Sequence, residues 1–240
     1  MTLLPWFFFI AILFAAVGHA GASGYLAVMA LYGIPPEVMR PAALIMNIGV
    51  ASIAAVRYLR AGLFNARLFW PLALSAVPMA FVGGLLTLPA AGYRPLVALV
   101  LVWAALQLWR HPADPPAAAI RTPALPLLLG SGAALGLLSG LTGVGGGIFL
   151  SPLLLLGRWS RTREVSGVVV LFVLCNSLAG LAGVLASGTP LPGQAALWAL
   201  AAAAGGLLGA ELGARRLGVP LIRRLLALVL LVAAFKMSGL

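Results

Sequence analysis

Apolar residues fill long uninterrupted runs along almost the whole chain, and polar residues gather in the short segments between the runs. A run of about 20 apolar residues is long enough for a helix to cross a bilayer. The strands of a membrane barrel would instead alternate polar and apolar residues, and these runs do not alternate. The pattern therefore predicts an all-α integral membrane protein that crosses the bilayer several times.

Four runs are too short for a full crossing, and they come in two pairs separated by glycine-rich sequence. The first pair is Leu4 to Val17 and Gly24 to Tyr32, and the second pair is Leu125 to Leu138 and Ile148 to Leu156. Each run is closer to half a crossing. Each pair is therefore either one long broken helix or a hairpin that enters the membrane and returns to the same side.

The chain carries one structural unit twice. The segment HAGASGYLAVMALYG, which starts at His19, aligns without a gap with GVGGGIFLSPLLLLG, which starts at Gly143, and Ser23 then matches Gly147. In both halves a Glu-Val pair follows, then a helix with a central Asn, a helix with paired glycines and a last apolar helix. Five features in the same order predict a duplication. The first transmembrane repeat covers residues 1–110, a Pro-rich linker covers 111–122, and the second repeat covers 123–240.

The distribution of basic residues favours the hairpins, because cytoplasmic loops of membrane proteins are enriched in Lys and Arg. If every apolar run crosses the membrane, the 15 basic residues divide 9 to 6, whereas two hairpins divide them 12 to 3. The cytoplasmic group would be Arg57, Arg60, Arg67, Arg110, Arg121, Arg158, Arg161, Arg163, Arg215, Arg216, Arg223 and Arg224, with Arg40, Arg94 and Lys236 outside. Each half then has three full crossings, which makes about eight hydrophobic segments. The halves form two inverted repeats, as in many secondary transporters.

Composition and charge narrow the function. The chain is 63% hydrophobic and 8% charged, with a mean hydropathy of +1.13. The net charge of +11 comes mainly from Arg residues in short loops, so it indicates membrane topology and not nucleic-acid binding. A cationic protein with only four acidic residues suits an anionic substrate. The single Cys175 rules out an internal disulfide.

The glycine-rich segments predict an anion site. Gly143, Gly145, Gly146 and Gly147 allow sharp bends, and irregular backbone at membrane depth persists only where it faces protein or a wet cavity. A helix that restarts after such a break points its N–H groups and positive dipole end at that cavity. The alternative is that the glycines only let helices pack closely.

The Gly-Ala-Ser-Gly motif around Ser23 also allows a catalytic interpretation, because intramembrane serine proteases of the rhomboid type carry their nucleophile in a G-x-S-G motif. Such a nucleophile needs a base within hydrogen-bond reach. The two histidines are His19, in the same motif, and His111, in the linker. Because Ser23 aligns with Gly147, the position requires a small residue first. We therefore expect no enzyme activity, and we expect Ser23 to bind substrate oxygens or to cap a helix.

The motif GLLSGLTGVGGGIFLSPLLL in the second half and the weaker copy GHAGASGYLAVMAL in the first are each followed by an Asn-bearing helix. These features resemble the sulfite exporter TauE/SafE family of bacterial permeases over nearly the whole chain. The resemblance implies an ion-coupled transporter of small sulfur-containing anions, such as sulfite or short organosulfonates, in the bacterial inner membrane. The first half departs from the glycine run at His19, Ala22 and Ser23.

The few polar residues within or beside the apolar runs are the site candidates. Asn47 and Asn176 lie near the centres of their helices, where each amide binds substrate or links neighbouring helices. Glu37 and Glu164 precede those helices, where a carboxylate favours the positive dipole end or serves proton coupling. The candidate substrate-binding residues are His19, Gly21, Ser23, Asn47, Thr142, Gly143, Gly145, Gly146, Gly147 and Asn176, and the proton-coupling candidates are His19, Glu37 and Glu164.

The sequence thus predicts a secondary transporter that moves a small sulfur-containing anion by alternating access at a midplane site, with proton coupling as a further hypothesis. A channel-like pore for a small anion and a membrane subunit of a larger complex are the alternatives. The chain has no motif for a metal, a nucleotide or a haem, so we expect no cofactor. The expected partners are the anion and the lipid bilayer, and the sequence indicates no oligomeric state.

Overall fold

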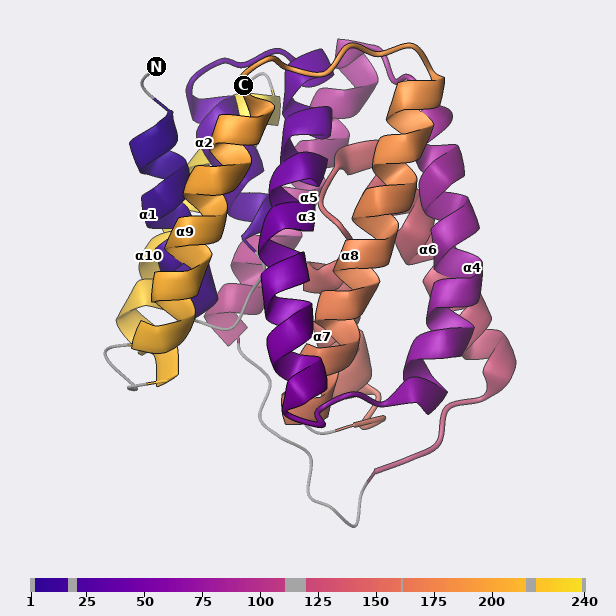
Figure 1. Cartoon of the computed structure of the whole chain (residues 1–240). Coiled ribbons are helices and arrows are strands. Elements are labelled where there is room, and N and C mark those ends of the chain that lie inside the picture. Colours follow the sequence, from indigo (N-terminus) through magenta and orange to yellow (C-terminus); the bar gives the residue numbers. More distant parts are fainter. Residues whose placement is uncertain (1–2, 17–20, 111–119, 161, 215–218, 239–240) are drawn as a thin grey trace.

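The computed structural model describes residues 3–16, 21–110, 120–160, 162–214 and 219–238, which form ten helices without any strand (Figure 1). The first half contains α1 (Leu4–Ala16), α2 (Ala22–Leu31), α3 (Pro36–Arg60), α4 (Ala66–Leu85) and α5 (Ala90–Arg110). The second half contains α6 (Leu125–Thr142), α7 (Gly147–Leu156), α8 (Thr162–Ala186), α9 (Ala195–Ala214) and α10 (Val219–Ser238). The eight predicted segments become ten helices because each short pair contributes two.

The helices have the length and surface that a bilayer requires. Within the described ranges, α3, α4, α5, α6 and α8 are each long and apolar enough to cross a membrane. Large apolar side chains such as Trp70, Leu74, Leu99 and Phe235 are more than half exposed, as lipid-facing residues are. The predicted all-α integral membrane fold is confirmed. The run from Leu125 to Leu138 was predicted to cover only about half of a crossing. The structure extends this helix, α6, to Thr142, which gives it 18 residues.

Both short pairs form hairpins. The rings of Trp6, near the start of α1, and Tyr32, just after α2, have centroids 6.3 Å apart. In the second pair, the Arg121 N–H before α6 donates to the carbonyl oxygen of Arg158 after α7, at 2.8 Å. The two outer ends of each hairpin therefore lie together, and the alternative of two long broken helices is wrong. Figure 1 shows the α1–α2 hairpin entering from the end that carries the N-terminus and the α6–α7 hairpin entering from the opposite end.

Helices of the two halves pack against one another. Helix α4 contacts α6 and α8, and helix α9 contacts α1 and α3. Glycines permit this packing, because a Cβ on Gly136 or Gly140 of α6 would overlap the carbonyl oxygens of α4. The close-packing role therefore applies to these glycines. The inverted relation of the halves and the boundaries at 1–110, 111–122 and 123–240 stay predictions, and linker residues 111–119 lie outside the described residues.

The two ends of the bundle differ in charge. The end of α3, the start of α4, the end of α5 and the segment before α6 lie at one end in Figure 1, which we call the basic end. The basic end carries Arg57, Arg60, Arg67, Arg110 and Arg121. Arg40 and Arg94 lie in the first two turns of α3 and α5, at the opposite end. The hairpin topology thus groups these described arginines in the way that the positive-inside rule requires.

Candidate functional site

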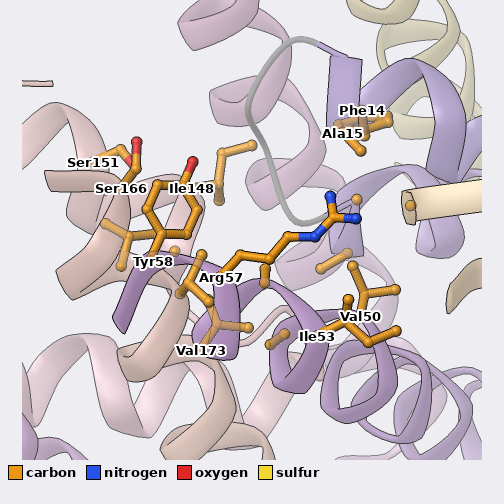
Figure 2. A pocket seen from close by; sticks show the side chains of 18 of the residues that line it. Phe14, Ala15, Val50, Ile53, Arg57, Tyr58, Ile148, Ser151, Ser166 and Val173 are labelled. Carbon is orange, nitrogen blue, oxygen red and sulfur yellow. The ribbon is translucent and has the colours of Figure 1, made fainter. Parts of the chain in front are cut away.

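A cavity of about 310 Å³ lies between α1, α2, α3, α7, α8 and α9. Among the described residues, its wall is mostly apolar, with a few hydroxyls and one charged group; these polar side chains are those of Ser23, Arg57, Tyr58, Ser151 and Ser166. Figure 2 shows Arg57 extended across the cavity with its guanidinium toward Phe14 and Ala15, while Tyr58, Ser151 and Ser166 lie together on the other side. An apolar wall with a few convergent polar groups is typical of a small-molecule site.

The starts of two helices face this cavity. Helix α2 begins after Gly21, which has φ 78°, and helix α7 begins after Gly146, which has φ 81°. Both glycines adopt the left-handed conformation, which a side chain would strain. The first N–H groups of a helix have no acceptor within the helix and carry a positive partial charge. Because Ala22 and Ser23 of α2 and Gly147 and Ile148 of α7 line the cavity, both positive helix ends act on its contents.

The cavity reaches the surface at the basic end. Along α3 its wall runs from Val50 to Ala61, a length of roughly 16 Å at 1.5 Å per residue. Arg57 and Ala61 are exposed, whereas Val50 and Ala51 are buried. The cavity therefore leads from the middle of the bundle, beside the two helix starts, to the end that carries most of the described arginines.

The α6–α7 break, Gly143 to Gly146, requires glycine for conformation as well as for space. Gly143 and Gly145 have φ 83° and 79°. A Cβ on Gly145 would lie 2.8 Å from Cγ1 of Val173 and 3.0 Å from Nδ2 of Asn47. A Cβ on Gly143 would lie 2.9 Å from the carbonyl oxygen of Arg40. The break is therefore packed tightly between α3 and α8.

Five fully buried polar side chains lie around this break. The Thr142 hydroxyl donates to the carbonyl oxygen of Leu138 at 2.7 Å, and we call the other four the amide–hydroxyl cluster: Asn47, Ser139, Asn176 and Ser177. Asn47 Nδ2 donates to the carbonyl oxygen of Gly143 at 3.1 Å. In the part of the chain that the structure describes, Asn47 Oδ1, both amide atoms of Asn176 and the hydroxyls of Ser139 and Ser177 have no hydrogen-bond partner. So many unpaired buried polar atoms are uncommon in native proteins and call for an explanation.

The opposite end of the bundle is closed by hydrogen bonds. Arg40, which is 7% exposed, donates to the carbonyl oxygens of Leu86 at 2.7 Å and Gly83 at 2.9 Å, and also to that of Gly84. These carbonyls end α4, where no intrahelical donor remains for them. The Tyr93 hydroxyl donates to the carbonyl oxygen of Thr142, the last residue of α6, at 3.0 Å. These bonds tie α3, α4, α5 and α6 together on the side of the break away from the cavity.

Comparison with known proteins identifies the family of the chain. The sequence pattern that defines the family described as "Sulfite exporter TauE/SafE" matches residues 3–237. The chain belongs to this family. It is also 39% identical over 234 residues to the "Probable membrane transporter protein y4hK" of Sinorhizobium fredii, and the match covers 96% of this chain and 95% of that protein. No solved structure matches the chain. The TauE/SafE chain is thus a membrane transporter. That Ser23 is not a protease nucleophile stays a prediction.

The structure separates the predicted substrate-binding residues of this TauE/SafE protein into two groups. Gly21, Ser23 and Gly147 line the cavity. The other described candidates lie in or around the α6–α7 break, behind the cavity wall, and they are Asn47, Thr142, Gly143, Gly145, Gly146 and Asn176. His19 lies outside the described residues. The substrate-binding roles stay predictions, and the two amides are not part of the cavity wall.

The predicted alignment of the two halves is shifted by one residue at the helix starts. Gly21 and Gly146 occupy the same position before α2 and α7, with ψ −6° and −11°. Counted from these glycines, Ser23 matches Ile148, and Ala22 matches Gly147. The prediction that Ser23 occupies the position of Gly147 was therefore wrong, because the first break holds one fewer glycine with which to fix the alignment.

The two acidic candidates lie near opposite ends of the bundle. Glu37 is in the first turn of α3 and lines a pocket of about 60 Å³ with Arg40 and Tyr93. Glu164 is in the first turn of α8 and accepts a hydrogen bond from the Ser160 hydroxyl. Their roles in capping or in proton coupling stay predictions.

The sequence did not indicate several residues that the structure places at the cavity, at the closed end or around the break. Arg57 and Arg40 were considered only as topology signals, and Ser139 and Ser177 were not considered. A helical spacing of three and four residues joins Asn47, Val50, Ala54 and Arg57, so the periodicity of α3 alone could have placed Arg57 below Asn47 on one face. No local signal distinguishes Arg40, whose partners are more than 40 residues away.

Proposed function

We propose that this protein is a carrier of small sulfur-containing oxyanions, such as sulfite or a short organosulfonate. The observation that carries the proposal is the meeting of two helix N-termini, those of α2 and α7, at one cavity. Backbone N–H groups and positive dipole ends bind anions without a fixed cation, which leaves the anion free to depart. Arg57 supplies a positive charge on the route from the basic end.

Alternating access is supported by the difference between the two ends. The cavity is accessible at the basic end, while Arg40 and Tyr93 bridge the helices at the opposite end. A transport cycle would break those bridges and close the cavity at the basic end. By the positive-inside rule, we place the basic end on the cytoplasmic side of the bacterial inner membrane.

Proton coupling remains a hypothesis, and it rests on His19, Glu37 and Glu164. Each of the two glutamates lies near one end of the bundle, so a proton taken up at either would act on opening or closing of that end. Anion uptake that is the same with and without a pH gradient would contradict this hypothesis.

The proposal is tested by uptake of labelled sulfite and sulfoacetate into proteoliposomes that contain the purified protein. A carrier gives saturable uptake, and unlabelled anion on the far side accelerates the uptake of label. A channel-like pore would conduct without saturation or acceleration, and a subunit of a larger complex would be inactive alone. Folded protein that moves neither anion would contradict the proposed substrate class.

A further inference from the structure

The hydrogen bond from Asn47 Nδ2 fixes the orientation of the Asn47 amide, and therefore of its unpaired oxygen, Oδ1. The carbonyl oxygen of Gly143 can only accept a hydrogen bond, so the Asn47 amide must present Nδ2 to it, and Oδ1 faces away. Oδ1 is fully buried and has no partner among the described residues. An amide oxygen cannot donate a hydrogen bond to an anion. It therefore requires a donor or a cation.

Other buried polar side chains lie around the same break. A Cβ on Gly145 would lie 3.0 Å from Asn47 Nδ2 and 3.2 Å from Ser177 Oγ, so α3 and α8 both contact the break there. Asn176 follows Phe172 and Val173 on α8 by four and three residues, and these two side chains pack on Gly146 and Gly145. Asn176 thus lies on the face of α8 that is directed to the break.

Ser139 brings a further hydroxyl from α6. Its Cβ would lie 3.6 Å from a Cβ on Gly146, and the Gly143 N–H donates to the Ser139 carbonyl oxygen at 2.8 Å. The cluster therefore combines two amides and two hydroxyls around the C-terminal end of α6, which carries a negative partial charge. Broken helices in transporters commonly hold a coupling cation at such an end.

The chemistry of the cluster selects the charge and size of the cation. Mg²⁺ and Ca²⁺ need carboxylate ligands, and no group of three His, Cys, Asp or Glu side chains suited to a metal occurs in the described ranges. Neutral oxygens suffice for a monovalent ion. The break is closely packed around Gly145, where an added Cβ would lie 2.8 Å from Val173 Cγ1, and such close packing favours a small ion over a large one.

We propose that the amide–hydroxyl cluster binds a sodium ion. Its place beside the start of α7, whose other side faces the anion cavity, lets the two bound charges attract each other across the helix start. A role of the ion in coupling rests on the proposed function of an anion carrier, whereas binding of the ion does not.

Binding is measured on the purified protein in detergent without any organic anion. The unfolding midpoint is recorded in NaCl, KCl and choline chloride at equal ionic strength. A bound ion stabilises the folded state by mass action, so we expect NaCl to raise the midpoint in a saturable manner, on the order of 5 °C at 100 times the dissociation constant. KCl and choline chloride should have little effect. Equal midpoints in all three salts would overturn the proposal.

Variants locate the ion. Ser177→Ala should raise the half-saturating Na⁺ concentration at least about tenfold, because one oxygen ligand is lost. Asn176→Asp should lower it, since a carboxylate strengthens a cation site and would abolish an anion site. Ser75→Ala is the matched control, because among the described residues the Ser75 hydroxyl bonds to carbonyl oxygens of its own helix, α4. A sodium effect that survives unchanged in both cluster variants would contradict this location.

The outcomes separate the two proposals. If anion uptake needs no sodium and sodium does not change the unfolding midpoint, the proposed ion site is contradicted and the proposed carrier function stands. If sodium raises the unfolding midpoint in a saturable manner but the protein transports neither sulfite nor sulfoacetate, the ion site is supported and the proposed substrate class is contradicted.

Discussion

Arg40 and Arg57 are the same residue type on the same helix, on either side of Asn47, and their surroundings differ completely. Arg40 is buried and donates to three carbonyl oxygens at the end of α4. Arg57 is exposed, lines the cavity and makes no ion pair with the described residues. The difference follows from what lies beside α3 at each level. At Arg40, the end of α4 presents carbonyl oxygens that lack intrahelical donors. At Arg57, the cavity interrupts the packing.

This contrast teaches that an arginine in a membrane transporter serves structure or transport according to the acceptors around it. Arg40 replaces the donors that the last turn of α4 lacks, and so it closes one end of the bundle. Arg57 lines the cavity, and in the proposed function its donors bind the incoming anion. Substitutions at the two positions should therefore act on different quantities, stability at one and transport at the other.

The largest expected effect is that of Arg40→Ala on stability. Loss of the guanidinium leaves the buried carbonyls of Gly83 and Gly84 and the part-buried carbonyl of Leu86 without this donor, so the free energy of unfolding should fall by about 3–5 kcal/mol. Thermal unfolding in detergent measures the change. Arg94→Ala is the control, because Arg94 is exposed at the same end, and it should change stability by no more than about 0.5 kcal/mol. Similar losses in both variants would show that Arg40 has no special role.

Gly145→Ala tests the α6–α7 break, which packs against α3 at Asn47, between the two arginines. The added Cβ meets a left-handed backbone and the side chains of Val173 and Asn47, so we expect a loss of about 2–4 kcal/mol. Gly62→Ala separates the two causes, because Gly62 also has a positive φ but has open space around it. Its loss should be only about 1–2 kcal/mol. Equal losses in the two variants would contradict the close packing of the break.

Arg57→Ala should lower the rate of anion uptake at least about tenfold, through the loss of roughly 1.4 kcal/mol of interaction with the anion, and leave thermal stability unchanged. Arg57→Lys should retain part of the rate, since it keeps the charge. Arg60→Ala is the matched control, because Arg60 is exposed one turn further along α3 and does not line the cavity. An equal loss in Arg60→Ala would assign the effect to the general charge of the basic end.

Tyr93→Phe should have the smallest effect. It removes only the hydrogen bond to the carbonyl oxygen of Thr142, so we expect the unfolding free energy to fall by about 1 kcal/mol. Because this bond belongs to the closed end, its loss should also increase the accessibility of that end to water-soluble thiol reagents. Unchanged accessibility together with lower stability would mean that Tyr93 stabilises the fold without controlling opening.

The two breaks, the hairpins and the sidedness of the arginines could be predicted because they depend on local sequence. Glycine runs, short apolar stretches and arginine-rich loops are each visible within a few residues. Which residues line the cavity could not be predicted, since Asn47 meets Gly143 across 96 positions of sequence, and this contact places its amide at the α6–α7 break and not in the cavity wall. The one-residue shift at Ser23 has a similar cause, because the first break lacks the glycines that would fix the alignment.

The central claim is that the cavity at the basic end holds the transported anion. Ala54 lines this cavity on α3, so Ala54→Cys in a Cys175→Ser background reports on its occupancy. Ala91→Cys, an exposed position at the opposite end, serves as the control. In inside-out vesicles an impermeant thiol reagent should label Ala54→Cys rapidly, and sulfoacetate should slow that labelling in a saturable manner. Labelling that proceeds at the same rate at every sulfoacetate concentration would contradict the claim.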